Sequence, residues 1–182
     1  FLGIVAVADV VKPTSKEAVQ KFRDYGIHVI MLTGDNEVTA QAIKEQVGID
    51  EVIAGVLPTQ KEKKISALKQ AGHKVAMIGD GVNDSPALSE ADVGIAISTG
   101  AAIAQEIADI TVSSEDLRAL VTLRQLSVAL MARIRWNYRF IIGFNCGLIG
   151  LGLVGILPPT TSALLHNMST LGISVKSMTN LL

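Results

Sequence analysis

An acidic loop that follows a short apolar run places the strongest constraint on the fold. Val75–Ile78 is apolar throughout, which is typical of a buried strand. The loop Gly79–Asp84 follows at once and carries two carboxylates, Asp80 and Asp84. In an open α/β sheet such a strand delivers these side chains to its carboxyl edge, where ligands bind. Two hard oxygen ligands on one tight loop suit Mg²⁺, which commonly accompanies phosphate, whereas an isolated Gly-Asp would indicate only an acidic turn before a helix.

Residues 1 to 115 alternate short apolar runs with amphipathic stretches. This alternation predicts an α/β fold with a partial, doubly wound parallel sheet. The first helix is expected to have Thr14 or Ser15 as its N-cap and Gly26 as its stop signal. The expected strands are 3–8, 28–32, 51–54, 75–78, 93–97 and 110–112, and the expected helices are 15–25, 37–47 and 58–71.

The remainder of the chain is different, because nearly all the charge lies before Arg139. Tyr138–Leu157 is about 20 residues long, enough to cross a bilayer core, although a buried helix of a large soluble core is the alternative. After Pro158 and Pro159 a second span is expected at 160–178. Arginines precede the first span, which predicts a cytoplasmic location for residues 1–136, with 116–136 as a connecting helix and 137–182 as a transmembrane hairpin.

Composition excludes several other classes of function. The net charge of -1 and the lack of a basic patch with aromatic residues give no sign of nucleic-acid binding. A single cysteine, Cys146, rules out an internal disulfide framework. The chain begins with Phe1 and no signal peptide is recognisable, so we expect an internal piece of a longer protein.

Two further segments carry groups that suit phosphate binding. Thr33 and Gly34 follow a predicted strand, so a hydroxyl and a backbone N–H can meet a phosphate oxygen there. A helix cap at Asp35 or Asn36 is the alternative for this segment. Lys61 lies at the start of a predicted helix, where it could neutralise phosphate charge or could be one more solvated lysine.

Together these motifs resemble a known family. The order of hydroxyl, lysine and acidic pair fits the haloacid-dehalogenase-type phosphotransferase fold. The segments Ala8–Pro13, Met31–Asn36, Pro58–Lys61, Gly79–Leu88 and Ala91–Ala96 look like the phosphorylation domain of P-type ATPases. The resemblance covers about residues 1 to 115. A helix followed by two final spans is similar to the C-terminal part of the heavy-metal (type IB) subgroup.

The resemblance implies roles for individual residues. Asp80 and Asp84 would hold Mg²⁺, and Asn83 would steady the loop between them. Thr33 would bind phosphoryl oxygens and Lys61 would offset the charge of the phosphorylated state, which is electrostatic catalysis by positioned groups. The catalytic set implied by the resemblance is Thr33, Gly34, Asp35, Lys61 and Asn83, with Asp80 and Asp84 as the Mg²⁺ ligands.

The phosphate acceptor of that family is not found in this chain. The acceptor is an aspartate in the string Asp-Lys-Thr-Gly-Thr, which does not occur here. ATP would bind mainly to a domain outside this sequence. We therefore expect a parent P-type ATPase that couples ATP hydrolysis through an aspartyl phosphate to metal export, and we expect the chain alone to be inactive.

Polar side chains in the predicted hairpin are candidates for the path of the transported ion. His166, Ser169 and Thr170 share one helix face by their spacing. Asn167 lies beside them, and Asn145 lies in the first span. The tentative ion ligands are His166, Asn145, Ser169 and Asn167, although hydrogen bonding between the two helices would also explain these residues.

The choice of ion follows from the ligand types. Phe144-Asn145 resembles the Tyr-Asn pair of copper(I) pumps, but His166 replaces the methionine expected in the last span. Imidazole and oxygen ligands suit Zn, Mn, Co, Ni or Fe better than Cu(I), although Met168 could supply sulfur. Zinc and cadmium pumps usually carry an acidic residue in the last span and a lysine in the preceding one, and neither is at the matching place here. The transported cation is therefore left open among Zn, Mn, Co, Ni, Fe, Cd and Cu, with a divalent ion slightly preferred. The expected partners are ATP, this cation, the lipid bilayer of the cell membrane and a metal-donor protein.

Two other functions remain open from the sequence. One is a membrane-tethered phosphatase of the same fold, which would need an aspartate nucleophile from outside this chain because Asp9 lacks the following Thr. The other is a truncated pump that acts as an inactive scaffold. The gene sequence before Phe1 would separate these alternatives from the pump.

Overall fold

The computed structural model describes residues 11–79, 82–97, 106–112 and 116–181. Two compact units make up the chain, Phe1–Val121 and Thr122–Leu182. The predicted strand at 3–8 and the side chain of Asp80 lie outside the described residues.

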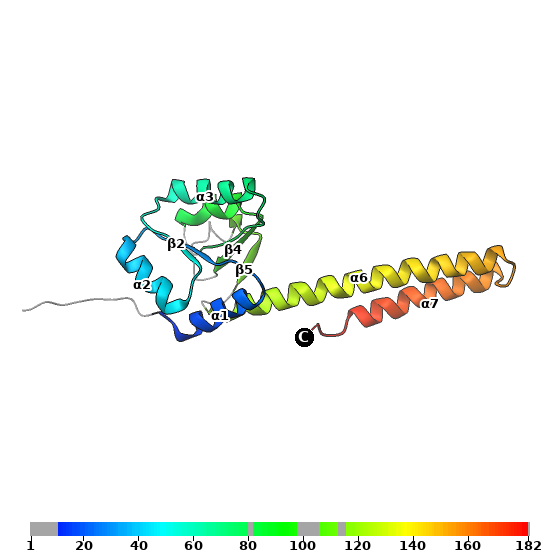
Figure 1. The fold of residues 1–182 in the computed structure, drawn as a ribbon. Coiled ribbons are helices and arrows are strands. Elements are labelled where there is room, and N and C mark those ends of the chain that lie inside the picture. The colour runs from blue at the N-terminus through cyan, green and yellow to red at the C-terminus, as the bar shows by residue number, and fades with distance from the viewer. Residues whose placement is uncertain (1–10, 80–81, 98–105, 113–115, 182) are drawn as a thin grey trace, which may run out of the picture. The chain divides into compact units, whose positions relative to one another are not determined.

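The first unit has the predicted alternation of helices and strands (Figure 1). Its elements are α1 (Pro13–Asp24), β1 (Ile30–Leu32), α2 (Glu37–Val47), β2 (Glu51–Ile53), α3 (Pro58–Gln70), β3 (Ala76–Gly79), the 3-10 helix η1 (Val82–Asp84), α4 (Ser85–Glu90), β4 (Val93–Ile97) and β5 (Ile110–Val112).

All described strand pairs are parallel, as the sequence predicts. The strand β1 pairs with β2, and β3, β4 and β5 form a second ladder in that order. Parallel strands joined by helices are the expected arrangement when both faces of a sheet are covered. The carboxyl ends of β3 and β4 therefore point in the same direction.

A carboxylate fixes the register at the amino end of each described ladder. Asp50 accepts a hydrogen bond from the backbone N–H of Val29 at 2.8 Å, just before β1. Asp92 accepts from Val75 at 2.9 Å, just before β3, and the carboxylate of Asp109 accepts from the N–H of Gly94 in β4 at 2.8 Å. Each aspartate thus ties the start of its own strand to the neighbouring strand.

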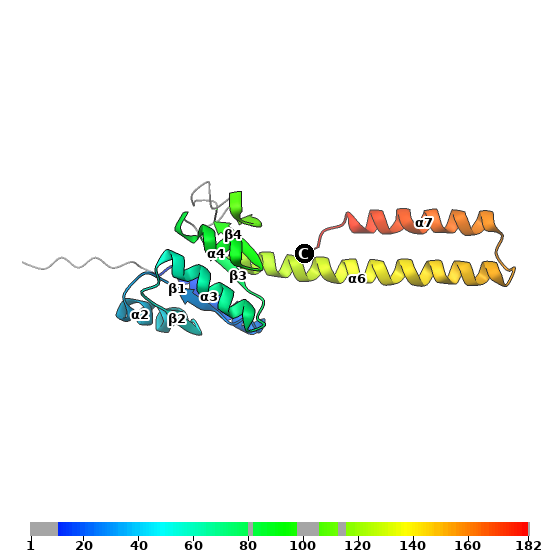
Figure 2. The ribbon, with the colours of Figure 1, turned by 90° about the horizontal axis from the view of Figure 1, so that it is seen from above.

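The core of this unit lies between β3, β4 and the helices α3 and α4 (Figure 2). Leu88 of α4 is the largest fully buried side chain among the described residues. A Cβ added to Gly94 would lie 2.7 Å from the carbonyl oxygen of Leu88, so glycine permits α4 to approach β4 closely. The buried cluster consists of Ile65, Met77, Ala87, Leu88 and Ala96.

The first helix begins earlier than the sequence predicts. Helix α1 starts at Pro13, with Lys12 as an N-cap that makes no side-chain capping bond, so neither Thr14 nor Ser15 is the cap. Proline is favoured in the first turn because its missing N–H would be unpaired there in any case. The bounds of α2 are as predicted, and Gly48 ends it with a left-handed φ of 82°.

Two helices form the second unit and lie side by side (Figure 1). The predicted connecting helix and the first predicted span are one continuous helix, α6 (Arg118–Leu153). It ends before Leu157, because Gly155 has a left-handed φ of 76° and the N–H of Ile156 bonds back to Leu151. The second helix is α7 (Pro159–Ser177).

Within the described part of the chain, no helix combines the length and the apolar character needed to cross a membrane.

Candidate functional site

The centre of the candidate site is a close charge pair between α3 and the loop after β3. Pro58 opens α3, and this places Lys61 in the first turn of the helix. Asp84 ends η1, immediately before α4. The ammonium group of Lys61 donates to Oδ1 of Asp84 at 2.7 Å, and the two side chains are 17% and 11% exposed. Two of the residues predicted for the site are therefore in direct contact.

Gly79 allows this arrangement. A Cβ at position 79 would lie 2.7 Å from Cβ of Asp84, a separation that real Cβ atoms do not show. The last residue of β3 thus brings Asp84 against the carboxyl end of the strand, where α/β sheets bind ligands. The side chain of Asn83 is exposed in the same loop.

The predicted phosphate-binding loop after β1 is ordered by its own side chains. The hydroxyl of Thr33 donates to Oδ2 of Asp35 at 2.8 Å, and the backbone N–H of Asp35 donates to the Thr33 hydroxyl at 3.1 Å. Asn36 caps α2 by accepting from the N–H of Thr39 at 2.9 Å. Of the two caps considered from the sequence, Asn36 is therefore the one that forms.

The two parts of the predicted phosphate site are not bonded to each other. Thr33 and Asp35 make no hydrogen bond or ion pair with Lys61 or Asp84 in the described part of the chain. Leu32, directly before Thr33, packs against the buried cluster that α3, α4, β3 and β4 form. A Cβ at Gly34 would make only ordinary contact, 3.8 Å from the carbonyl oxygen of Val56.

The charge pair offers two of the groups that a magnesium and phosphate site uses. Asp84 offers a carboxylate, the oxygen ligand that Mg²⁺ prefers, and Lys61 offers a compact cation for phosphate oxygens. Among the described residues, which do not include Asp80, no group of three or more His, Cys, Asp or Glu side chains could hold a metal ion.

The two helices of the second unit are joined by a polar contact in mid-hairpin. Nδ1 of His166 in α7 lies 2.7 Å from Oδ1 of Asn145 in α6. Both residues line an open pocket of about 430 Å³ together with apolar neighbours that include Leu148 and Ile149. The sequence left two interpretations of these residues, ion ligands or hydrogen bonding between the helices, and the structure shows such a contact. The particular pair could not be predicted, because neither helix alone specifies the register between them.

The hydroxyl groups near His166 are bonded within their own helix. Ser169 and Thr170 both donate to the carbonyl oxygen of His166, at 2.8 Å and 3.1 Å. Each hydroxyl keeps acceptor capacity but has no proton left to donate. Asn167 is exposed.

The family follows from comparison with known proteins. The family model of the haloacid dehalogenase-like hydrolases matches residues 1–92, which is half of the chain. The chain belongs to this family.

Individual relatives are more specific. The chain is 48% identical over 176 residues to the copper-exporting P-type ATPases of Staphylococcus aureus strains JH9 and Newman. The alignment covers 97% of this chain and 22% of those proteins, so the chain spans about a fifth of the length of the curated relatives it matches.

Solved structures agree with this relationship. A zinc-transporting PIB-type ATPase in its E2.Pi state superposes with a TM-score of 0.86 at 32% identity, covering 92% of this chain and 27% of the other. The catalytic domain of a CPx-ATPase superposes with a TM-score of 0.60 at 39% identity, covering 64% and 46%. The predicted resemblance to heavy-metal P-type ATPases, and to that class of enzyme, is therefore confirmed.

Proposed function

We propose that this chain is part of an ATP-driven pump that exports a transition-metal cation through an aspartyl-phosphate intermediate. The observation that carries the proposal is the Lys61–Asp84 pair at the carboxyl end of β3. Its position in a parallel α/β sheet is where a phosphoryl group would be held. The similarity to copper-exporting and zinc-transporting ATPases supports metal transport as the work to which this chemistry is coupled.

In this proposal the residues of the chain position and neutralise a phosphoryl group carried by an aspartate outside it. Mg²⁺, held by Asp84 together with Asp80, would supply positive charge to the phosphoryl oxygens. Lys61 would turn from Asp84 towards the phosphoryl oxygens, and the Thr33 hydroxyl would bind one of them. Such fixed charges and donors provide most of the catalysis in phosphoryl transfer.

We propose that residues 137–153 of α6 and the whole of α7 lie in a membrane, with residues 1–136 on its cytoplasmic side. Support comes from the apolar side chains that this hairpin exposes. Ile149 is 63% exposed and Leu171 is 66% exposed, while Leu148 is the buried apolar residue between positions 137 and 177. Exposed apolar surface of this kind needs cover from lipid or from neighbouring helices.

The pairing of His166 with Asn145 supports a role for His166 as an ion ligand. A carboxamide oxygen only accepts hydrogen bonds, so the proton of a neutral imidazole sits on Nδ1. Nε2 then keeps its lone pair for an ion, as in metal sites where a second group fixes the tautomer. We propose His166 as the ligand and Asn145 as its partner, with Ser169 and Asn167 as further oxygen donors and a divalent ion preferred over Cu(I).

Metal-stimulated ATPase activity of the complete transporter in liposomes tests this function. Asp84→Asn should abolish activity with every metal, while Glu62→Gln, an exposed carboxylate one residue from Lys61, should leave it intact. His166→Ala should remove the response to the transported ion. Formation of an acylphosphate on this 182-residue chain alone, or hydrolysis of simple phosphate esters by it, would contradict the proposal and favour a phosphatase.

A further inference from the structure

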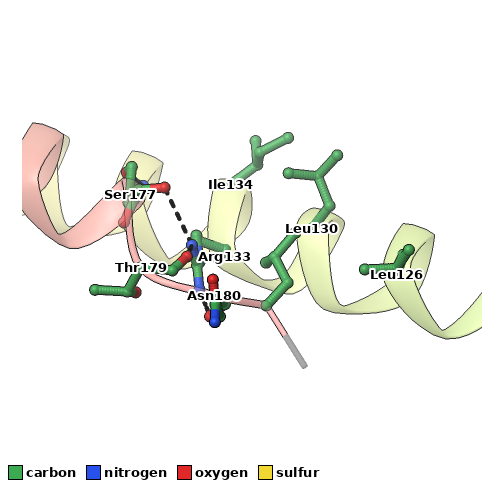
Figure 3. A pocket seen from close by; sticks show the side chains of 9 residues that line it. Leu126, Leu130, Arg133, Ile134, Ser177, Thr179 and Asn180 are labelled. Carbon is green, nitrogen blue, oxygen red and sulfur yellow. Dashed lines mark hydrogen bonds between the residues drawn. The ribbon is translucent and has the colours of Figure 1, made fainter.

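Arg133 of α6 binds the end of α7. The last carbonyl groups of a helix have no partners within it and carry partial negative charge. One amino group of the Arg133 guanidinium donates to the carbonyl oxygens of Ser177 at 3.1 Å and Thr179 at 2.6 Å. The other donates to the carbonyl oxygen of Asn180 at 2.7 Å, so a single side chain satisfies three backbone acceptors (Figure 3).

Two more polar contacts join the helices next to the hydrogen bonds of Arg133. Nδ2 of Asn137 donates to the hydroxyl of Ser177 at 2.9 Å. The ammonium group of Lys176 lies 3.0 Å from the centroid of the Trp136 ring, a cation–π contact. Together with the pairing of Asn145 and His166, these contacts link α6 to α7 from one end of the hairpin to its middle.

Apolar packing specifies the register of this hairpin only weakly. A Cβ added to Gly143, Gly147 or Gly150 of α6 would meet nothing within 4 Å, so these glycines do not lock the helices by close approach. No residue of α7 is buried. The polar contacts are therefore the features that distinguish one alignment of α7 along α6 from another.

We propose that Arg133 is a positioning residue that fixes the register in which His166 meets Asn145. A slip of α7 by one helical turn moves its residues by about 5.4 Å. Such a slip would break both the three bonds of Arg133 and the contact between His166 and Asn145. A lysine has no planar fork and cannot satisfy three divergent carbonyls in the same way. The consequence for ion binding rests on the function proposed above, whereas the register itself does not.

Cross-linking in the complete transporter measures the register directly. With Cys146 replaced by serine, Leu148→Cys with Ala163→Cys reports the alignment of the structure, because both residues line one pocket. Leu148→Cys with Asn167→Cys reports an alignment shifted by one turn. A short bis-methanethiosulfonate reagent should link the first pair in the parent. Arg133→Gln should lower the ratio of first to second product by about threefold or more.

Arg135→Gln is the matched control. Arg135 has the same charge on the same helix, but it donates to Met131 of its own helix at 3.2 Å. This variant should keep the parent ratio. Arg133→Lys, which retains the charge and the helix, should give an intermediate ratio even if the glutamine variant folds poorly. A parent ratio in both Arg133 variants would overturn the proposal.

Ion dependence gives the second measurement. In Arg133→Gln the metal concentration for half-maximal ATPase activity should rise about tenfold with little change in the maximal rate, as for loss of a group that orients a ligand. An equal loss of maximal rate in Arg133→Gln and Arg135→Gln, without a change in half-maximal concentration, would refute a positioning role. If no metal stimulates the parent, the proposed function fails, and the cross-linking ratio still decides the role of Arg133.

Discussion

At the scale of single residues, Lys61 is the counter-ion of Asp84 in the structure. Both side chains are largely removed from water, so each charge depends on the other. A cation that binds Asp84 must therefore compete with an ammonium group already in place. The contribution of Lys61 to stability, and its competition with Mg²⁺ for Asp84, can therefore be measured without ATP.

Lys61→Met should lower the free energy of unfolding by about 2 kcal/mol, because it leaves the Asp84 carboxylate buried and uncompensated. Added Mg²⁺ should restore part of the lost stability, since the ion takes the place of the ammonium group. Denaturant titrations of the 182-residue chain with and without Mg²⁺ measure both effects. Lys63→Met, at an exposed position of α3, is the control and should change little.

Asp92 should make the stability of the first unit depend on pH. The backbone N–H of Val75 and the ammonium group of Lys74 hold the pKa of the Asp92 carboxyl below its usual value. A carboxyl group with a lowered folded-state pKa contributes stability above its unfolded pKa, about 3.9, and loses that contribution as pH falls through the folded value.

Asp92→Asn should therefore unfold at lower urea concentration than the parent at pH 7, and the difference should shrink below about pH 4. Urea titrations over this range measure it. Asp24→Asn, an exposed carboxylate at the end of α1, is the control. A difference that persists unchanged at the lowest pH would mean that Asp92 acts through its shape and not its charge.

At the scale of elements, the close approach of α4 to β4 depends on one missing side chain. Gly94→Ala would place a Cβ 2.7 Å from the backbone oxygen of Leu88, and backbone cannot rotate away as a side chain can. We expect a loss of about 2 kcal/mol in unfolding free energy. Gly34→Ala meets only an ordinary contact at 3.8 Å and should be nearly neutral in the same denaturation experiment.

Element boundaries were predictable where local signals agree. The cap at Asn36 and the stop at Gly48 specify α2, and the apolar run 93–97 specifies β4. The end of α6 was missed, because a run of apolar residues continues past Leu153 while the left-handed turn at Gly155 ends the helix. Glycine is common enough on packed helices that its position alone does not identify such a turn.

The candidate site, like the element boundaries, was predictable only in part. Lys61 and Asp84 were assigned to one site because each lies near the carboxyl end of a predicted strand, and they are in contact. Two other features depend on the alignment of α6 and α7: the contact between Asn145 and His166, and the hydrogen bonds of Arg133 to the end of α7. That alignment arises from contacts between distant residues and has no signal in either segment alone.

At the scale of the whole molecule, the two units differ in where their apolar side chains lie. The first unit has a buried cluster around Leu88, whereas α7 buries none of its residues. An apolar surface of this extent in the second unit should bind lipid.

The full chain should therefore float with liposomes in a density gradient, while residues 1–121 alone should not. Flotation separates membrane binding from aggregation, because aggregates sediment. A scrambled order of residues 138–177 with the same composition is the control for unspecific apolar binding. Recovery of the full chain in the lipid-free lower fractions at neutral pH would contradict a membrane location.

The residues that align the strands and the residues of the candidate site lie at opposite ends of the strands. Asp50, Asp92 and Asp109 hold the strands in register from the amino ends. Lys61 and Asp84 occupy the opposite end and take no part in that alignment. Substitutions that retune the chemistry can thus accumulate in the loops at one end without misaligning the strands.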